Sequence, residues 1–495
     1  MREWVRQKAP VKVENIKEGS AGYKILRLGK DDSEKTDEAS AAIDKLEVVF
    51  DKAAGQDKTR KNLFLVKEAP EHLRPADNRK VHLVVSTRSG TGLALNFYES
   101  VLQPLLADFG LKPATVSGED DAESPHLNLI VTRDAQSIRE FTASLPLGVE
   151  HTVVLMSGDG GIVESLNGKA TVDDDDESGS ASASSREQPL PLIAMLPLGT
   201  GNALFNSLHK GVYAACAAES TPSPLVLGLR TLLRGRRAPL PSFRVDFSPG
   251  SRQISYKNSD DDVPGAVREQ LGLVTHLYGA IVASYGFHAQ LVWESDTPEY
   301  RKHGAKRFGM VAAELLQESH AYRARVERSR PLLPRSAEGR QEKQEEIEPI
   351  DRPRHAYVLA TLVSNLERTF AISPASRPLD GALRLVHFGP VGGERTMEIM
   401  TQAYNGGRHV GMTWTTENGG EEEKKEEGVG YEQVGEVSVV THEEDARWRK
   451  VCVDGTIVEL PLQGSMTVRT ESAPHLDILV DPSVIAAAAA AAAIS

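Results

Sequence analysis

Hydrophobic and polar positions follow one pattern in the first half of the chain. Between residues 80 and 209, short aliphatic and β-branched runs alternate with amphipathic stretches, which is typical of a parallel sheet with connecting helices. Apolar residues at three- and four-residue steps predict a helix over 93–109, with Gly110 as its stop signal. The runs that predict strands are 81–85, 127–131, 152–156 and 192–196.

A different pattern begins near residue 271. Short strands bounded by turn residues follow one another to about residue 479, interrupted by an amphipathic helix over 307–317. The clearest of these strands are 357–364, 382–387, 436–440 and 457–460. The two patterns together predict an α/β + β fold, in which an N-terminal three-layer Rossmann-like parallel-sheet domain precedes a β-rich sandwich domain.

Shifts in composition set the expected domain limits. Residues 1–79 form an extension with strand-like runs at 24–28 and 46–50, followed by the α/β domain over 80–215 and the β-rich domain over 216–482. Charged, serine-rich or proline-rich segments cannot bury enough apolar area to fold. They predict a disordered insertion, two loops and a frayed alanine-rich tail at 173–188, 331–353, 417–430 and 483–495.

Composition argues against several classes of protein. The chain has 495 residues, with 57 basic and 70 acidic ones and a formal net charge of −13, which argues against a nucleic-acid binder because phosphate backbones require a basic face. The two cysteines, Cys216 and Cys452, are too few for a disulfide framework and favour a reducing compartment. The first residues lack the apolar core of a signal peptide, and the stretch 271–287 is too polar to span a membrane. We therefore expect a cytoplasmic protein whose contact with intracellular membranes is peripheral.

Glycine-bearing turns follow three of the four predicted α/β strands. The turns occupy residues 86–92, 157–161 and 197–202. Because the carboxyl ends of parallel strands share one edge of a sheet, the three turns are expected to converge there. Glycine lets backbone N–H groups approach an anion closely, so such turns suit phosphates. The alternative is that each glycine only makes a tight turn, which is less plausible for three turns in register than for one.

Asp159 lies between two glycines of the middle turn. A carboxylate beside a phosphate site is electrostatically costly unless it binds Mg²⁺ or accepts a proton from an attacking hydroxyl. The alternative is an aspartate that caps the following helix.

These residues resemble a known family. Residues 157–168 read SGDGGIVESLNG and are similar to the G/S-G-D-G-x-x-x-E-x-x-N-G motif of the diacylglycerol kinase catalytic domain. Residues 197–204, PLGTGNAL, resemble the family's P-x-G-S/T-G-N-A segment. The stretch 285–308 is similar to a segment of sphingosine kinases, and Asp380-Gly381 and Asp454-Gly455 match two later D-G turns. The resemblance covers about four fifths of the chain, and the serine that opens the first motif is most like sphingosine (long-chain base) kinases.

The resemblance implies a lipid kinase that uses ATP and Mg²⁺, with the nucleotide at the edge of the α/β sheet and the lipid in the β-rich domain. By position, Asp159 matches the general base, Asp454 a residue near Mg²⁺, and Gln290 and Val292 the lipid head-group segment. The positions that match nucleotide contacts are Ser86, Ser89, Gly90, Thr132, Ser157, Gly158, Gly160, Gly199, Thr200, Gly201, Arg301, Arg307, Asp454 and Gly455. Arg301 and Arg307 would clamp phosphates; the alternative is a solvated basic helix face. For Asp380 we expect a structural role in its turn.

Several positions depart from the family's pattern. Ser86-Thr87 replaces Asn-Pro in the first turn, and Thr456 replaces the glutamate of the D-G-E turn. Sphingosine kinases carry aspartates in A-D-x-D, where this chain has Gln290 and Val292, so a cationic amine would lose its counter-charge. The leading expectation is phosphorylation of a primary hydroxyl, that of a sphingoid base. A diacylglycerol- or ceramide-type substrate, and a nucleotide- or lipid-binding pseudokinase without turnover, are the alternatives.

Overall fold

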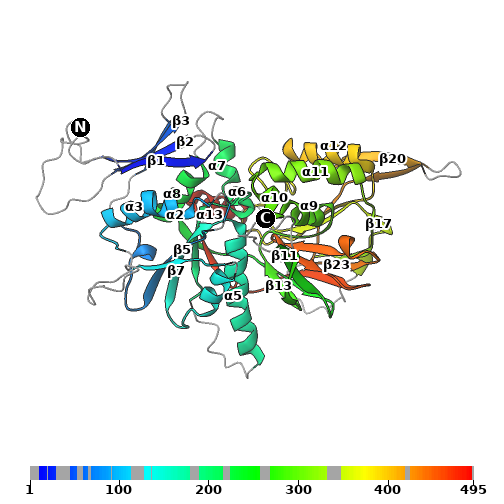
Figure 1. Cartoon of the computed structure of the whole chain (residues 1–495), viewed down its shortest axis with the longest axis horizontal. Coiled ribbons are helices and arrows are strands. Elements are labelled where there is room, and N and C mark those ends of the chain that lie inside the picture. The colour runs from blue at the N-terminus through cyan, green and yellow to red at the C-terminus, as the bar shows by residue number, and fades with distance from the viewer. Residues whose placement is uncertain are drawn as a thin grey trace, which may run out of the picture. The chain divides into compact units, whose positions relative to one another are not determined.

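The computed structural model divides the chain into two compact units (Figure 1). The first contains residues 1–200, 208–239 and 475–495, and the second contains residues 201–207 and 240–474. The structure describes all residues except 1–10, 19–20, 29–44, 53–59, 65–68, 88, 91, 113–126, 135, 179–188, 216–222, 257–267, 332–346, 418–423 and 493–495.

A six-stranded sheet organises the first unit. Its strand order is β6-β5-β7-β8-β27-β9, in which β6, β5, β7, β8 and β27 run parallel and β9 is antiparallel to β27. The strands are β5 (Arg79–Val85), β6 (Asn128–Val131), β7 (Glu150–Ser157), β8 (Leu192–Pro197), β9 (Arg236–Pro239) and β27 (Asp477–Val480). The four strands predicted between residues 80 and 209 are therefore present, side by side and parallel.

Helices cover both faces of this sheet. One face packs against α2 (Ala94–Phe97), η2 (Tyr98–Leu102), α3 (Gln103–Asp108) and α8 (Pro224–Arg234) in a single buried apolar cluster. On the other face lie α4 (Ser137–Ala143), whose Phe141 ring meets that of His82 on β5, and α5 (Asp159–Ser178). The predicted helix over 93–109 thus forms with a π-helical turn at its centre, and Gly110, at φ 73°, ends it. These three layers confirm the predicted fold class of the first unit.

Two antiparallel sheets pack face to face in the second unit. One has the order β13-β10-β26-β23-β15-β16, with β17 paired to β15, and the other has the order β12-β11-β25-β24-β14-β18-β19-β22. The first sheet comprises β10 (Phe243–Phe247), β13 (His276–Gly279), β15 (Tyr322–Ser329), β16 (Ile347–Pro349), β17 (Arg354–His355), β23 (Glu436–Thr441) and β26 (Ser465–Thr470). The second comprises β11 (Arg252–Tyr256), β12 (Arg268–Leu273), β14 (Val282–Gly286), β18 (Tyr357–Thr361), β19 (Arg384–Phe388), β22 (Gly430–Gln433), β24 (Lys450–Val453) and β25 (Thr456–Glu459). One buried cluster joins side chains of both sheets, which confirms the predicted sandwich.

The remaining elements lie outside these sheets. Residues in the N-terminal extension form a four-stranded antiparallel sheet of β1 (Val11–Glu18), β2 (Ala21–Leu28), β3 (Lys45–Lys52) and β4 (Arg60–Phe64), so both strand-like runs noted there are strands. The helices are η1 (Glu71–Leu73), α6 (Ala203–Leu208), α7 (Lys210–Ala215), α9 (Phe287–Ser295), α10 (Pro298–Arg301), α11 (Lys306–Glu318), α12 (Gly392–Tyr404), η4 (Ala446–Trp448) and α13 (Pro482–Ala492).

Three segments expected to be irregular contain regular structure. Helix α5 continues to Ser178, into the predicted insertion, because a helix that is already nucleated by buried residues extends at little cost. Strand β16 lies within the predicted loop 331–353, and the predicted loop 417–430 contains β21 (Lys424–Gly428), which forms a hairpin with β20 (Thr413–Glu417). The alanine-rich tail begins as α13, whose Val484 is buried. Residues 179–188, 332–346 and 418–423 of these segments lie outside the described residues.

The two units also differ from the expected domain limits at residues 215 and 482. Helix α8 and strands β9 and β27 belong to the first unit. Ile478 and Val480 of β27 are fully buried beside β8. A short apolar run predicts a strand, but its composition does not say which sheet the strand joins.

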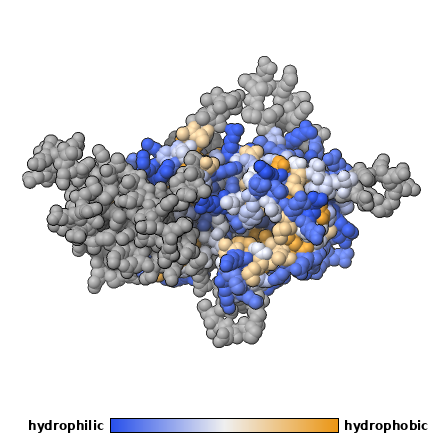
Figure 2. All heavy atoms as spheres, turned by 90° about the horizontal axis from the view of Figure 1, so that it is seen from above, coloured by the Kyte–Doolittle hydropathy of each residue, from blue (hydrophilic) through white to orange (hydrophobic). Residues whose placement is uncertain are grey.

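In the part of the chain that is described, no helix is both long and apolar enough to cross a membrane. Figure 2 shows apolar residues gathered in a strip between hydrophilic ones on one face of the molecule. Exposed large apolar side chains on the helices of the second unit include Met310 on α11 and Met397 and Tyr404 on α12.

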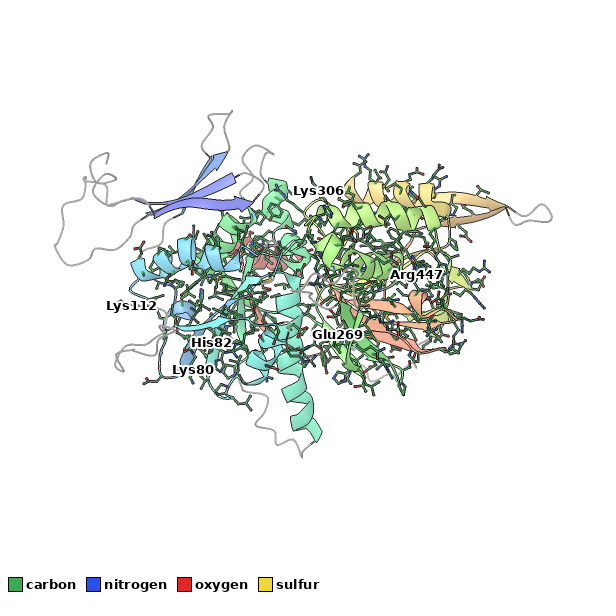
Figure 3. All side chains as sticks on the ribbon, in the orientation of Figure 1. Lys80, His82, Lys112, Glu269, Lys306 and Arg447 are labelled. Carbon is green, nitrogen blue, oxygen red and sulfur yellow. The ribbon has the colours of Figure 1, made fainter. Side chains whose placement is uncertain are left out.

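A hydrogen bond joins two histidines of the parallel sheet, His82 on β5 and His151 on β7. His151 Nε2 donates to the carbonyl of Pro146 at 2.9 Å, so its Nδ1 is left to accept from His82 Nε2 at 3.0 Å. His82, labelled with Lys80 on β5 in Figure 3, is buried. Burial lowers the pKa of His82 to about 4, with smaller effects of the same sign from His151 and Lys80. The neutral ring is therefore part of the folded state.

This arrangement predicts acid sensitivity. In the unfolded chain His82 regains its ordinary pKa of about 6.5 and binds a proton that the folded chain does not, so stability is lost as the pH falls from about 6.5 to about 4. Between pH 7 and pH 5 we expect wild type to lose about 2 kcal/mol more unfolding free energy than His82→Gln. Urea unfolding followed by circular dichroism measures this difference. His303→Gln, which removes an exposed ring, is the control, and equal pH dependence in wild type and His82→Gln would contradict the assignment.

Candidate active site

The three glycine-bearing turns of the first unit meet at the carboxyl edge of its sheet. The N–H of Gly158, after β7, donates to Ser89 Oγ, after β5, at 2.8 Å. The N–H of Leu198, after β8, donates to the carbonyl of Ser157 at 3.0 Å. The N–H of Ser86 donates to the carbonyl of Met156 at 3.1 Å. The predicted convergence of three turns is therefore what the structure shows.

Two of these glycines are required by contact between backbones. A Cβ on Gly90, where φ is 55°, would lie 2.3 Å from the carbonyl oxygen of Leu198. A Cβ on Gly158 would lie 2.7 Å from the Cα of Gly199. In contrast, a Cβ on the exposed Gly160 would meet nothing within 4 Å. The turns thus touch backbone to backbone. This contact requires glycine at Gly90 and Gly158 but not at Gly160.

Helix α5 begins at Asp159, directly after the middle turn. Its first turn directs backbone N–H groups and the positive end of the helix dipole toward the edge where the three turns meet. Such a helix start is suited to a phosphate group. Asp159 is half-buried there, which is the place expected for a carboxylate that works beside a phosphate. The first helical position is also where a capping aspartate would stand, so the geometry accommodates both interpretations.

Thr132 has a structural contact that the sequence did not indicate. Its Oγ1 accepts from the N–H of Thr87 at 3.2 Å, and its carbonyl accepts from Thr87 Oγ1 at 3.1 Å. Thr132 is buried and therefore fixes the first turn from the neighbouring strand β6. A contact of this residue with nucleotide stays a prediction.

The other predicted site residues belong to the second unit, with Thr200 the last residue of the first and Gly201 beginning a short segment of the second. Arg301 makes a two-pronged ion pair with Asp296, at 3.0 and 2.6 Å, and Arg307 approaches the same carboxylate at 3.4 Å. Their side chains are 33% and 17% exposed. They are thus a pair gathered on one carboxylate, which argues against a merely solvated basic face.

Asp296 is the residue of this cluster that sequence reasoning missed. Burial lowers the pKa of Arg307, and its Nε is buried without a hydrogen-bond partner among the described residues. Two guanidinium groups on one carboxylate concentrate positive charge at this place, which suits an anion. An aspartate five residues before Arg301 and eleven before Arg307 was the available signal.

Asp454 and Gly455 form the two-residue turn between β24 and β25, with φ 48° and 90°, as in a type I′ hairpin. The Asp454 carboxylate accepts three backbone N–H groups, from Ala280 at 2.6 Å, Ile281 at 3.1 Å and Val282 at 2.5 Å. Asp454 is buried, so this carboxylate ties the turn to the start of β14. Its predicted place near Mg²⁺ stays a prediction.

The described part of the chain holds no cluster of three or more histidine, cysteine, aspartate or glutamate side chains that could bind a metal ion.

Gln290 and Val292 lie on α9. Gln290 is 2% exposed, and its amide donates to Glu294 Oε1 at 2.5 Å. Glu294 also pairs with Arg447, labelled in Figure 3, at 3.2 Å. Val292 packs against a small apolar cluster that contains Trp293. The Glu294 carboxylate is therefore already in an ion pair, and its partner Arg447 also pairs with Glu318 at 3.0 Å.

Comparison with known proteins finds a family that is similar to a large part of the first unit. The family model described as diacylglycerol kinase catalytic domain matches residues 45–223. Residues 45–223 are therefore similar to this catalytic domain. This domain includes the three turns and Asp159, which all lie within the matched residues.

Curated relatives of the chain are sphingosine kinases. Human sphingosine kinase 1 is 28% identical over 249 residues, which cover 50% of this chain and 51% of the relative. Human sphingosine kinase 2 is 27% identical over 216 residues, which cover 42% of this chain and 28% of the relative. The match thus spans about half the length of the first relative. A solved putative diacylglycerol kinase from Bacillus anthracis is 15% identical, with a TM-score of 0.47, and the match covers 82% of this chain and 96% of that one.

The backbone contacts between the turns predict that neighbouring glycines tolerate substitution differently. Gly158→Ala forces the middle turn away from Gly199, and we expect a loss of about 1–3 kcal/mol in unfolding free energy. Gly160→Ala should change stability by no more than about 0.5–1 kcal/mol and in the stabilising direction, because alanine is favoured in helices. Urea unfolding of the two variants checks this, and equal destabilisation would show that the turns do not touch as described.

Proposed function

We propose that this protein is an ATP-dependent lipid kinase that transfers the γ-phosphoryl group to a primary hydroxyl, with a sphingoid long-chain base as the expected acceptor. The observation that carries the proposal is the meeting of three glycine-bearing turns at the start of α5, where Asp159 stands. Phosphoryl transfer depends on positioning and charge stabilisation more than on covalent chemistry. A site of backbone N–H groups and one carboxylate supplies both.

In the proposed reaction the turns bind the nucleotide and Asp159 handles the proton. Backbone N–H groups of the turns containing Ser89, Gly158 and Gly199 bind phosphate oxygens. The Asp159 carboxylate accepts the proton of the lipid hydroxyl while that oxygen bonds to the γ-phosphorus, and the bond from the γ-phosphorus to the β,γ-bridging oxygen breaks to release ADP. Mg²⁺, when bound to the nucleotide, neutralises charge on the phosphates. Arg301 and Arg307 supply positive charge for phosphate contacts if one of them exchanges Asp296 for an anion.

A small hollow with mostly apolar walls lies in the second unit, and it has room for about one water molecule rather than for a lipid chain. It is lined by Phe287, Leu315, Leu316, Ser319, His320, Tyr322, Ala356, Thr396 and Trp448. The His320 ring stacks on Trp448 at 4.0 Å, and the Arg447 guanidinium carbon lies 4.1 Å from the centre of the same indole. Trp448 is thus held between two cationic or polar side chains.

The second candidate acceptor is an uncharged lipid such as a diacylglycerol or a ceramide. Gln290 stands where sphingosine kinases carry an aspartate, and the adjacent carboxylate of Glu294 is shared with Arg447. A cationic amine at this position would have to compete with Arg447 for the Glu294 carboxylate. We also propose that the enzyme is cytoplasmic and reaches its insoluble acceptor by peripheral contact with intracellular membranes.

The test is transfer from labelled ATP to sphingosine, diacylglycerol and ceramide by the full chain. We expect Asp159→Asn to lower turnover by about 10²–10⁴-fold while ATP still binds, because the variant lacks only the proton acceptor. Glu99→Gln, an exposed change on η2, is the control and should transfer as wild type does. Transfer unchanged in Asp159→Asn would overturn the assignment of the base. Nucleotide binding without transfer to any acceptor would favour a pseudokinase.

A further inference from the structure

Three connections between the two sheets of the sandwich lie side by side at one end of the second unit. Strands β13, β10 and β26 are neighbours in one sheet, and β12, β11 and β25 are neighbours in the other. Tight turns join β10 to β11, β12 to β13 and β25 to β26. The N–H of Val274 donates to the carbonyl of Ser251 at 3.0 Å, and the N–H of Ser248 donates to that of Ser465 at 3.0 Å. These bonds hold the three turns in one row.

This row of turns carries leucines that are exposed rather than buried. Leu273 is 73% exposed and Leu462 is 60% exposed, the two highest values among the large apolar side chains that the structure describes. Both Leu273 and Glu459 pair with Arg252 on β11. Because neighbouring strands lie about 4.8 Å apart, the strands that lead to the two leucines are about 10 Å apart. Two exposed leucines therefore project from the same end of the sandwich.

A β-bulge adds a third leucine and blunts the edge of the sheet. On β12, Gly272 pairs with Gln253 and Gln270 pairs with Ile254, which leaves Leu271 as the extra residue. Leu271 is 43% exposed. Bulges interrupt the regular ladder of hydrogen bonds at sheet edges and so disfavour the addition of another strand. Glu269, labelled in Figure 3, marks the strand in which this bulge lies.

The charge of the turns differs from that of the chain. Residues 248–252, 271–275 and 461–464 include no acidic side chain and one basic side chain, Arg252, although the chain as a whole carries a net charge of −13. Arg252 is exposed and donates to Gln270 Oε1 at 2.7 Å. The turns are therefore apolar and weakly basic in an acidic protein.

We propose that Leu271, Leu273 and Leu462, with Arg252, form a surface that docks on an anionic lipid bilayer. We call it the sheet-corner surface. The leucines enter the interfacial region of the bilayer, and the Arg252 guanidinium contacts lipid phosphates. The surface is made of turn tips whose residues include no acidic side chain to repel anionic lipids, and its bulged edge disfavours a partner strand. The proposal rests on the proposed function in that a lipid acceptor gives the protein a reason to bind membranes.

The test is co-flotation of the full chain with vesicles of phosphatidylcholine mixed with phosphatidylserine. We expect the double variant Leu273→Ser/Leu462→Ser to lower the partition coefficient by at least about tenfold, because it removes the apolar area that is buried on docking. Leu147→Ser is the matched control, since Leu147 is a 48% exposed leucine in a turn of the first unit, and it should float as wild type does. Arg252→Gln should weaken binding to the mixed vesicles and leave binding to pure phosphatidylcholine unchanged.

Phosphoryl transfer to a detergent-dispersed acceptor is measured in parallel and separates the two proposals. Reduced flotation with unchanged transfer, and unchanged thermal unfolding, supports the sheet-corner surface. Flotation of the double variant equal to that of wild type overturns it, as does the absence of vesicle binding by wild type. A wild-type dimer in light scattering that becomes monomeric in the double variant would also overturn it, in favour of a contact between copies of the chain. Lack of transfer by wild type would count against the kinase proposal alone.

Discussion

The direct contact of three backbone turns at the edge of the parallel sheet is the constraint on which the candidate site depends. Gly90 and Gly158 have no room for a side chain, because Leu198 and Gly199 of the next turn occupy that space. The hydrogen bond between Gly158 and Ser89 closes the gap between the first two turns. Such close packing is possible only because parallel strands end together at one edge, and it leaves backbone donors rather than side chains to meet a ligand.

In the second unit, too, one residue serves two structural purposes, although the architecture is different. Asp454 joins two strands through a turn and at the same time satisfies three backbone N–H groups at the start of β14. A buried carboxylate is tolerated only with such partners. The same unit gathers Arg301 and Arg307 on Asp296, so its charged side chains are organised in small, mostly compensated groups around an apolar sandwich.

Much of this organisation could be predicted from local sequence. Aliphatic runs predicted β5, β6, β7 and β8, and the glycines after three of them predicted the turns, because strand and turn preferences act over a few residues. Long-range partners could not be predicted in the same way. The backbone N–H groups that donate to Asp454 are more than 170 residues away in the chain. The sequence of a strand such as β27 does not indicate which sheet it joins, because that depends on packing in the folded chain. Residues 173–178 were expected to be disordered from their charge, yet the helix that precedes them continues through the run.

The most direct measurement of the central claim is hydrogen exchange of the full chain with and without a non-hydrolysable ATP analogue. If the three turns hold one triphosphate together, the amides of residues 86–92, 157–162 and 197–200 gain protection at the same nucleotide concentration, while the sheet-corner turns at 248–252 and 461–464 do not change. Protection of only one of the three turns, or protection elsewhere with none at these turns, would contradict the account.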